Sequence, residues 1–291
     1  MSEPIHTLNA PLDTPPKTVV SLVPSITESL FDLNLGNRLI GRTDYCVYPA
    51  DRVAAVPALG GTKNPDVERI IDLQPELIFA NAEENREQDV QALRDAGIPV
   101  WVSMPIRVAD VFTLLWNIMY LFDETAMVPR IRLIEQVYDR LLGMNEARTS
   151  ALPKVFVPIW YNPLMTINQH TYMHDLLQVC GAWNVFAERE RLYPLKADLG
   201  EQDADPTLAQ GRDTRYPRVT FEEVEQAQPD VILLPSEPFA FTEIQRAEFK
   251  KLDVPATDQG RIHLVDGSWL TWHGTRLAYA LNDLPALLRV D

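Results

Sequence analysis

One short segment near the C-terminus, 268–276 (SWLTWHGTR), concentrates side chains suited to holding an aromatic or metal-containing ligand. The indole rings of Trp269 and Trp272 offer flat surfaces that can lie against a macrocycle. His273 can coordinate a metal or donate a hydrogen bond, and Arg276 can hold a carboxylate, amide or phosphate group. The competing interpretation is structural: Trp269 packs between helices, and His273 caps the last helix.

Two turns place further candidates at the ends of expected strands. The turn at 60–63 (GGTK) precedes a helix, so its backbone can approach a ligand closely, and Thr62 can contact that ligand. The turn lacks the G-x-x-x-x-G-K-[ST] spacing of a phosphate loop. Trp160 begins the turn at 160–163 (WYNP), at a strand end, which is where open α/β sheets bind ligands. Burial of Trp160 in the core is the rival interpretation.

The sequence offers little that could support catalysis. His170 and His174 have the spacing of a zinc site on a helix, but Thr171 stands where the protease signature requires glutamate. A helix start capped by Thr171 is the alternative interpretation. No G-x-S-x-G nucleophile elbow occurs. Cys46 and Cys180 lie far apart in apolar contexts, which indicates buried free thiols. We therefore expect a binding protein and not an enzyme.

Short apolar runs alternate with amphipathic segments along the chain, which predicts α/β lobes with mostly parallel sheets. The run at 18–23 (TVVSLV) reads as a buried strand, followed by a helix from Glu28 that ends at Gly36. Ser25 or Thr27 can cap that helix. The second half repeats the rhythm, and includes a helix at 221–227 and strands at 231–235 and 262–265.

These elements divide the chain into an N-terminal arm, two lobes and a connector. Residues 1–17 hold four prolines and are expected to form a loose arm. The N-terminal lobe spans 18–107 and the C-terminal lobe 151–291. Between them, 108–150 has the pattern of one long connecting helix region, with a new segment starting at Pro129. An acidic, aperiodic insertion at about 190–215 is expected to be exposed. We predict that a cleft between the lobes holds the ligand.

Composition limits the classes of partner. The chain has 291 residues, with 26 basic and 41 acidic side chains and a net charge of −15. Such a surface repels nucleic acids and anionic lipids, so a nucleic-acid partner is not expected. The longest apolar stretches are too short to span a membrane, and we expect a monomer. No signal peptide is visible at 1–17, so we expect either a cytoplasmic protein or an export signal outside this sequence.

Four blocks of the sequence resemble a known family. They are VVSLVPSITESLFDLNLGNRLIGRTDYCVYP, NPDVERIIDLQPELIFA, HDLLQVCGAWNVFA and RVTFEEVEQAQPDVILLPS. Their order and spacing are similar to those of the helical-backbone substrate-binding proteins of ABC transporters, which carry cobalamin, haem and siderophores. The resemblance extends from about Thr18 to Leu288 and is strongest to the cobalamin-binding branch.

This resemblance implies the receptor component of an ABC importer, with two Rossmann-like lobes joined by a single long backbone helix. It implies a corrinoid ligand, or alternatively haem or a ferric siderophore, and no intrinsic cofactor. By the same resemblance Tyr45 is a ligand-stacking tyrosine, and the aromatic and arginine positions of 268–276 are ligand contacts. Two alternatives remain: a cytoplasmic carrier of a corrinoid or metal cofactor, and a metalloenzyme that uses His170, His174 and His273.

Two helical segments look like copies of one unit. Glu68 lies in a short helix before Gln74-Pro75-Glu76-Leu77, and Glu222 lies in a short helix before Gln228-Pro229-Asp230-Val231. In the family that the chain resembles, the matching glutamates pair with arginines on a membrane permease. The alternative is that both are ordinary first-turn acids favoured by the helix dipole.

Overall fold

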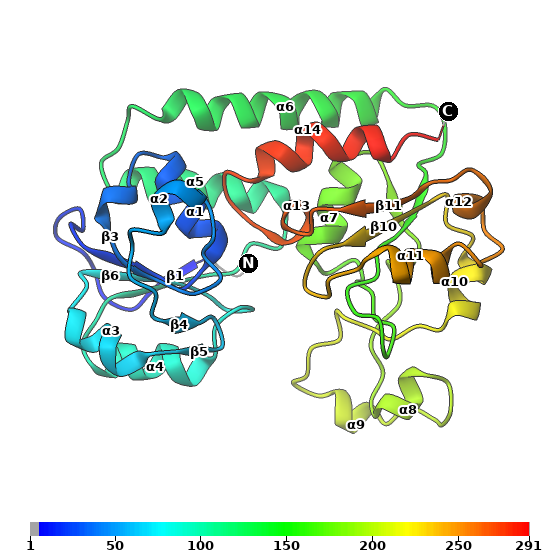
Figure 1. The fold of residues 1–291 in the computed structure, drawn as a ribbon, viewed down its shortest axis with the longest axis horizontal. Helices are drawn as coiled ribbons and strands as arrows, with labels where there is room; N and C mark the ends of the chain where they lie inside the picture. Colours follow the sequence, from blue (N-terminus) through cyan, green and yellow to red (C-terminus); the bar gives the residue numbers. More distant parts are fainter. Residues whose placement is uncertain (1–5, 291) are drawn as a thin grey trace. The chain divides into compact units, whose positions relative to one another are not determined.

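A computed structural model describes residues 6–290 of the chain, which form two compact units. The first unit ends at Gln136 and also takes in Trp272–Leu277. The second comprises Val137–Thr271 and continues from Ala278. Figure 1 shows the elements of both units. Within residues 6–290, no helix is both long enough and apolar enough to cross a membrane.

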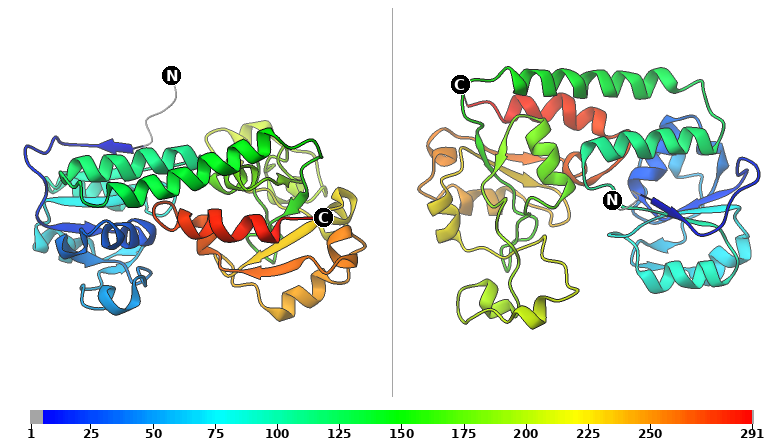
Figure 2. Two further views of the ribbon diagram at one scale, coloured as in Figure 1. Left: turned by 90° about the horizontal axis from the view of Figure 1, so that it is seen from above. Right: turned by 180° about the vertical axis from the view of Figure 1, so that it is seen from behind.

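The first unit is built on a five-stranded sheet in the order β1-β7-β6-β2-β3, in which every pair is parallel except β1 with β7. All five residues of β6 are buried, as expected for a parallel strand covered on both faces. In Figures 1 and 2, α3 and α4 lie on one side of the sheet and α1 and α5 on the other. The elements are β1 (His6–Leu8), β2 (Val19–Ser21), α1 (Pro24–Asp32), the 3-10 turn η1 (Gly36–Arg38), β3 (Leu39–Arg42), α2 (Ala50–Val53), β4 (Gly60–Gly61), β5 (Asn64–Pro65), α3 (Val67–Leu73), β6 (Leu77–Asn81), α4 (Glu87–Asp95), β7 (Val100–Ser103), α5 (Val108–Leu121) and the first part of α6 (Val128–Glu146).

The second unit has a four-stranded, fully parallel sheet in the order β11-β10-β8-β9. Figures 1 and 2 show α7 and α14 on one side of this sheet and α10 and α11 on the other. A core of aromatic and aliphatic side chains, including Phe156, Phe249 and Ile232, fills the space beneath α10 and α11. Besides the rest of α6, the elements are β8 (Lys154–Phe156), α7 (Tyr172–Val179), β9 (Trp183–Asn184), α8 (Leu195–Asp198), α9 (Pro206–Ala209), α10 (Phe221–Ala227), β10 (Val231–Pro235), α11 (Glu243–Phe249), α12 (Pro255–Asp258), β11 (Ile262–Val265), α13 (Ser268–Thr271) and α14 (Leu277–Leu287).

The expected α/β fold with mostly parallel sheets is confirmed, and the connector region contains two helices. The region expected at 108–150 forms α5 and α6, and α6 begins next to Pro129, as the sequence pattern indicates. The boundary between the units, after Gln136, falls inside α6, whereas α5 belongs wholly to the first unit.

Part of the segment expected to be a loose arm is a strand instead. Residues His6–Leu8 form β1 and pair with β7. Asn9 anchors the end of this strand, because its Oδ1 accepts from the backbone nitrogen of Val100 (2.6 Å) and its Nδ2 donates to the carbonyl of Ile98 (3.4 Å). The ring of His6 also lies 4.4 Å from that of Trp101. The remainder of the arm before residue 6 is outside the described residues.

The boundaries of the first helix differ from those expected. Helix α1 begins at Pro24 rather than at Glu28, because proline lacks the N–H that the first helical turn leaves unpaired. Neither Ser25 nor Thr27 caps it, since both lie inside the helix. The chain leaves the helix through Asn34, which adopts a left-handed conformation (φ 63°), so Gly36 is not its terminator.

Candidate functional site

The carboxyl ends of the parallel strands β2, β3 and β6 lie at one edge of the first unit's sheet, and the loops that follow them form the candidate binding face. Asn85 joins these loops, because its Nδ2 donates to the carbonyl oxygens of Leu22 (3.2 Å) and Thr62 (3.0 Å). Its Oδ1 accepts from the backbone nitrogen of Asn81 at 2.8 Å. Thr62, a predicted site residue, is thereby fixed beside the end of β2.

Tyr45 presents its ring to solvent on this face, with 63% of the residue exposed. The β4–β5 hairpin packs against it: a Cβ added to Gly61 would lie 3.3 Å from Tyr45 Cε2 and 2.5 Å from Asn64 Oδ1. A larger residue at this position would displace the Asn64 side chain and crowd the Tyr45 ring. The structure therefore brings two predicted contacts together, Tyr45 and the turn that carries Thr62.

A stack of two aromatic rings and a guanidinium group also belongs to the first unit. The Arg276 guanidinium lies 4.1 Å from the ring centroid of Tyr48 and 5.0 Å from that of Trp272. The two rings are 5.8 Å apart, edge to face. Tyr48 and Trp272 both remain partly exposed, so the stack offers aromatic surface to a ligand. Tyr48 was not among the residues predicted to contact the ligand.

Arg276 is buried and its charge is already paired. Its Nε and Nη2 donate to the two carboxylate oxygens of Glu28 at 2.7 Å and 2.6 Å, and both side chains are 8% exposed. This bidentate geometry is the strongest form of a carboxylate–arginine pair. The expectation that Arg276 holds a carboxylate, amide or phosphate of the ligand stays a prediction, and in this structure Glu28 takes its Nε and Nη2 donors. The guanidinium also positions Tyr48 and Trp272.

The neighbouring residues fasten the segment 272–277 to α1. The backbone nitrogen of Thr275 donates to Ser29 Oγ (3.0 Å), and its hydroxyl donates to Asp32 Oδ2 (2.8 Å). Gly274 adopts φ 105°, and a Cβ there would lie only 2.2 Å from Ser29 Oγ. Arg130 pairs with the same Asp32 oxygen at 2.9 Å. These contacts explain why a C-terminal segment belongs to the N-terminal unit.

His273 lies inside the first unit and is 5% exposed. Burial lowers its pKa to about 4, and the nearby carboxylates of Glu83 and Asp110 only partly oppose this shift. The imidazole is therefore neutral at pH 7. Because the ring is buried, the structural interpretation of His273 is favoured over a ligand contact.

In the second unit, the carboxyl ends of β8 and β10 carry an aromatic cluster. Trp160 follows β8 and is 43% exposed, so its burial in the core is excluded. Phe239 follows β10, and its ring lies 5.6 Å from Trp160, 6.0 Å from Tyr161 and 4.8 Å from Phe241. Sequence reasoning missed Phe239, although the motif Phe-Ala-Phe just after a buried strand was the available signal.

The segment 268–276 is divided between the units. Trp269 lies in α13 of the second unit and is partly buried, whereas Trp272 belongs to the first. Helix α13 is started by Asp266, whose Oδ1 accepts from the backbone nitrogen (3.0 Å) and the hydroxyl (2.6 Å) of Ser268.

The histidine pair on α7 has the geometry of a capped helix. Thr171 is the N-cap, and its hydroxyl accepts from the backbone nitrogen of His174 at 3.3 Å. The His174 ring is buried 5.5 Å from that of Trp183, and burial lowers its pKa, with nearby His170 lowering it further. His170 is exposed. Within residues 6–290, no group of three or more His, Cys, Asp or Glu side chains is placed to hold a metal ion.

Both cysteines are buried free thiols, as the sequence indicates. Burial raises the pKa of Cys180 to about 12 and also raises the pKa of Cys46. Both thiols are therefore protonated at neutral pH, and neither has the character of a nucleophile.

Glu68 and Glu222 occupy equivalent places in the two units, and both are exposed. Each is the second residue of a seven-residue helix, α3 or α10, whose N-cap is Asp66 or Thr220. Both helices end at a left-handed glutamine, Gln74 (φ 47°) or Gln228 (φ 50°), and a buried strand follows. The predicted repetition of this segment is confirmed.

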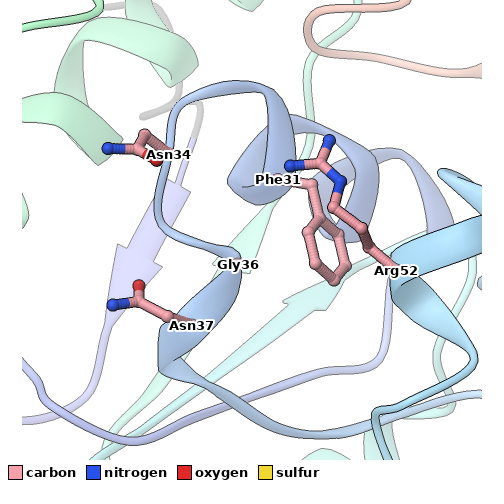
Figure 3. A pocket seen from close by; sticks show the side chains of 5 residues that line it. All are labelled: Phe31, Asn34, Gly36, Asn37 and Arg52. Carbon is pink, nitrogen blue, oxygen red and sulfur yellow. The ribbon is translucent and has the colours of Figure 1, made fainter.

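A separate hollow lies elsewhere on the first unit, between the end of α1 and α2. Its volume is about 290 Å³, and its lining residues are Phe31, Asn34, Gly36, Asn37 and Arg52. The Arg52 guanidinium lies 5.1 Å from the Phe31 ring centroid, and Figure 3 shows these two side chains together, with both asparagine amides directed away from them. No predicted site residue lines this hollow.

Comparison with known proteins identifies the family of this chain. The model of the periplasmic binding protein family matches residues 19–251, which is most of the chain. The chain belongs to this family. The vitamin B12-binding protein of Pectobacterium carotovorum is 23% identical over 270 residues, covering 92% of this chain and 87% of that protein. That of Yersinia pestis is 26% identical over 177 residues, covering 60% of this chain and 62% of that protein.

Solved structures share the fold. The periplasmic vitamin B12 binding protein BtuF of Vibrio cholerae has a TM-score of 0.71 and 20% identity, with 94% of this chain and 97% of that chain covered. The periplasmic haem-binding protein RhuT of Roseiflexus sp. RS-1 has a TM-score of 0.69 at the same identity and the same coverage. This member of the family is a substrate-binding protein of ABC transport systems and not an enzyme.

Proposed function

We propose that this chain binds a corrinoid and delivers it to an ABC permease. The observation that carries the proposal is the exposed Tyr45 ring, held over the Gly61 hairpin at the carboxyl edge of a parallel sheet. The Tyr48–Trp272 stack in the same unit, and the cluster of Trp160 and Phe239 in the second unit, provide further flat surface. Stacking on rings that are already positioned requires no bond-making and costs little conformational entropy on binding.

Charge at the site favours a corrinoid over haem. A haem carries two carboxylates and is best held by an unpaired cation. Arg276 is already neutralised by Glu28, and the buried His273 is uncharged at pH 7. A corrin ring bears mainly neutral amide side chains, which match a face of aromatic rings and backbone groups. The vitamin B12-binding relatives from Pectobacterium and Yersinia agree with this choice.

Glu68 and Glu222 are the proposed contacts with the permease. Both carboxylates are exposed, one in each unit, at the same position of a repeated helix. Exposed charges of this kind set the orientation and the rate of docking more than they set affinity. A cytoplasmic carrier would have no need of such a matched pair.

Calorimetry with cobalamin, haem and a ferric siderophore tests the ligand. We expect cobalamin to bind with micromolar or tighter affinity, about −8 kcal/mol or better, and to quench tryptophan fluorescence. Haem and the siderophore should bind at least about tenfold more weakly, because Arg276, the cation beside the Tyr48–Trp272 stack, is already paired with Glu28. A tighter haem complex, or no heat with cobalamin, would remove the corrinoid proposal.

A further inference from the structure

The segment 189–218 contains five arginines, two of which lie over one buried tyrosine, although acidic residues outnumber basic ones in the whole chain. Tyr193 is 7% exposed, and its hydroxyl donates to the carbonyl of Asp213 at 2.8 Å. The guanidinium groups of Arg191 and Arg212 lie 4.8 Å and 5.0 Å from its ring centroid. This part of the chain contains α8 and α9 (Figure 1). Most residues of the predicted insertion are exposed, as expected, whereas Tyr193, Ala197 and Asp198 are buried.

The carboxylates in this region are largely engaged with other partners. Asp213 is held by Arg215 through two contacts, of 2.9 Å to its Nε and 2.7 Å to its Nη2. The fully buried Asp198 accepts from the backbone nitrogens of Leu192 and Arg218, both at 2.9 Å. Its Oδ2 is 3.6 Å from Arg218 Nη1, which is a long contact for an ion pair.

Arg191 and Arg218 keep shielded donors without a hydrogen-bond partner among residues 6–290, whereas Arg212 is exposed. The positive charge of Arg191 also interacts electrostatically with the Asp213 carboxylate. The Nε of Arg191 and the Nε and Nη1 of Arg218 are shielded from solvent and have no hydrogen-bond partner in that range. Burial lowers the pKa of Arg218 and the positive charge of Arg191 lowers it further, while the Asp198 carboxylate opposes this shift in part. Shielded guanidinium donors without partners destabilise the fold unless an anion accompanies them.

We propose that Arg191, Arg212 and Arg218 form a binding site for an oxyanion, a phosphate or a carboxylate. Guanidinium groups suit such an anion, because their planar pairs of N–H donors match the oxygens of a phosphate or a carboxylate. The site lies within the second unit. Its backbone is joined to the candidate aromatic cluster, because Arg218 forms a bridge with Met165, which in turn forms one with Trp160. The proposal does not depend on the identity of the main ligand.

Titration of the full chain with inorganic phosphate tests the site, in a buffer without oxyanions and with ionic strength held constant by chloride. We expect binding near or below about 1 mM and a rise in the unfolding temperature. Arg191→Gln should weaken phosphate binding by about tenfold or more. Arg212→Gln should also weaken it, and because Arg212 is exposed, this variant should fold normally. The matched control is Arg132→Gln, since Arg132 also stacks on a ring, that of Trp116 at 4.7 Å, but pairs with Glu135.

A second titration identifies the source of the anion. Cobalamin carries a phosphodiester, and cobinamide lacks it. If the anion belongs to the ligand, Arg191→Gln weakens cobalamin binding and leaves cobinamide unchanged. If the anion is free phosphate, both corrinoids are unaffected while phosphate binding is lost. The site is overturned if phosphate and chloride act alike on the wild type. It is equally overturned if the Arg191 and Arg212 variants bind phosphate as tightly as Arg132→Gln does.

Discussion

Exposure alone does not make a tyrosine a binding residue. The position of Tyr45 and its packing against a neighbouring hairpin distinguish it from other exposed tyrosines. Tyr120 on α5 is more exposed, at 76%, and partly exposed aromatic residues are common on protein surfaces. Tyr45 differs because it lies at the carboxyl edge of the sheet and packs against the backbone of Gly61. Its ring is thus held in place before a ligand arrives, which reduces the entropy lost on binding.

Replacement of this ring should weaken corrinoid binding. Tyr45→Ala removes the stacking surface and should cost about 1–3 kcal/mol, or roughly 5- to 150-fold in Kd by calorimetry. Tyr120→Ala is the control and should bind like the wild type. Equal affinities for the two variants would show that Tyr45 takes no part in binding.

His273 should make the stability of the protein depend on pH. In the folded chain its pKa is lowered to about 4, from 6.5 for the free side chain. As pH falls below 6.5, His273 therefore takes up a proton in the unfolded chain but stays neutral in the folded chain. The stabilisation from the neutral imidazole is complete above pH 6.5 and is lost progressively toward pH 4, by about 3 kcal/mol in total.

Urea unfolding of the wild type and His273→Gln between pH 7.5 and 4.5 measures this effect. The variant should lose less stability than the wild type over that interval, because its side chain does not titrate. The measured quantity is the slope of the free energy of unfolding against pH. A variant that is less stable than the wild type by the same amount at every pH would therefore not support the prediction. Parallel curves would show that the His273 pKa is close to its ordinary value.

At the scale of elements, the sequence predicted the bounds of a helix or strand well where local residues define where the element begins and ends. The helix at 221–227 and the strand at 231–235 match α10 and β10, because Thr220 caps the one and a β-branched apolar run makes the other. The start predicted for helix α1, Glu28, is four residues late, because Pro24 directly after the strand is the first residue of the helix.

The candidate site was less predictable, since its decisive partner lies far away in sequence. Arg276 was predicted as a ligand contact, but its partner Glu28 is 248 positions away, and no local pattern links them. The exposed ring of Trp160 and the cap role of Thr171 could be inferred from neighbouring residues. The burial of His273 could not, because it depends on packing within the first unit.

The attachment of the segment 272–277 to α1 should be important for stability. Glu28→Ala leaves the buried Arg276 charge unpaired, and should lower the free energy of unfolding by about 3–5 kcal/mol. Glu243→Ala breaks an exposed pair with Arg246 and should cost less than about 1 kcal/mol. Chemical denaturation of both variants makes the comparison. A Glu28 effect no larger than that of Glu243 would mean that the pair does not hold the segment.

At the scale of the whole molecule, the repeated helices α3 and α10 suggest recognition of a two-fold partner. Glu68→Ala combined with Glu222→Ala should leave corrinoid affinity unchanged and abolish uptake through the reconstituted permease. The matched control is Glu87→Ala with Glu243→Ala, which removes one exposed first-turn acid from another helix of each unit. Equal uptake by both double variants would favour the interpretation of Glu68 and Glu222 as ordinary helix-dipole acids.

The path of the chain through its two units constrains the order in which they can be finished during synthesis. The first unit includes Trp272–Leu277, so a ribosome has made most of the 291 residues before Arg276 exists. Until then Glu28 has no buried counter-charge, and the N-terminal unit emerges without its last segment. Although domains generally fold from the N-terminus onward, here completion of the first unit must wait for nearly the whole chain to be translated. A ribosome stalled before codon 276 should therefore display an N-terminal unit that proteases cleave more readily than the released protein.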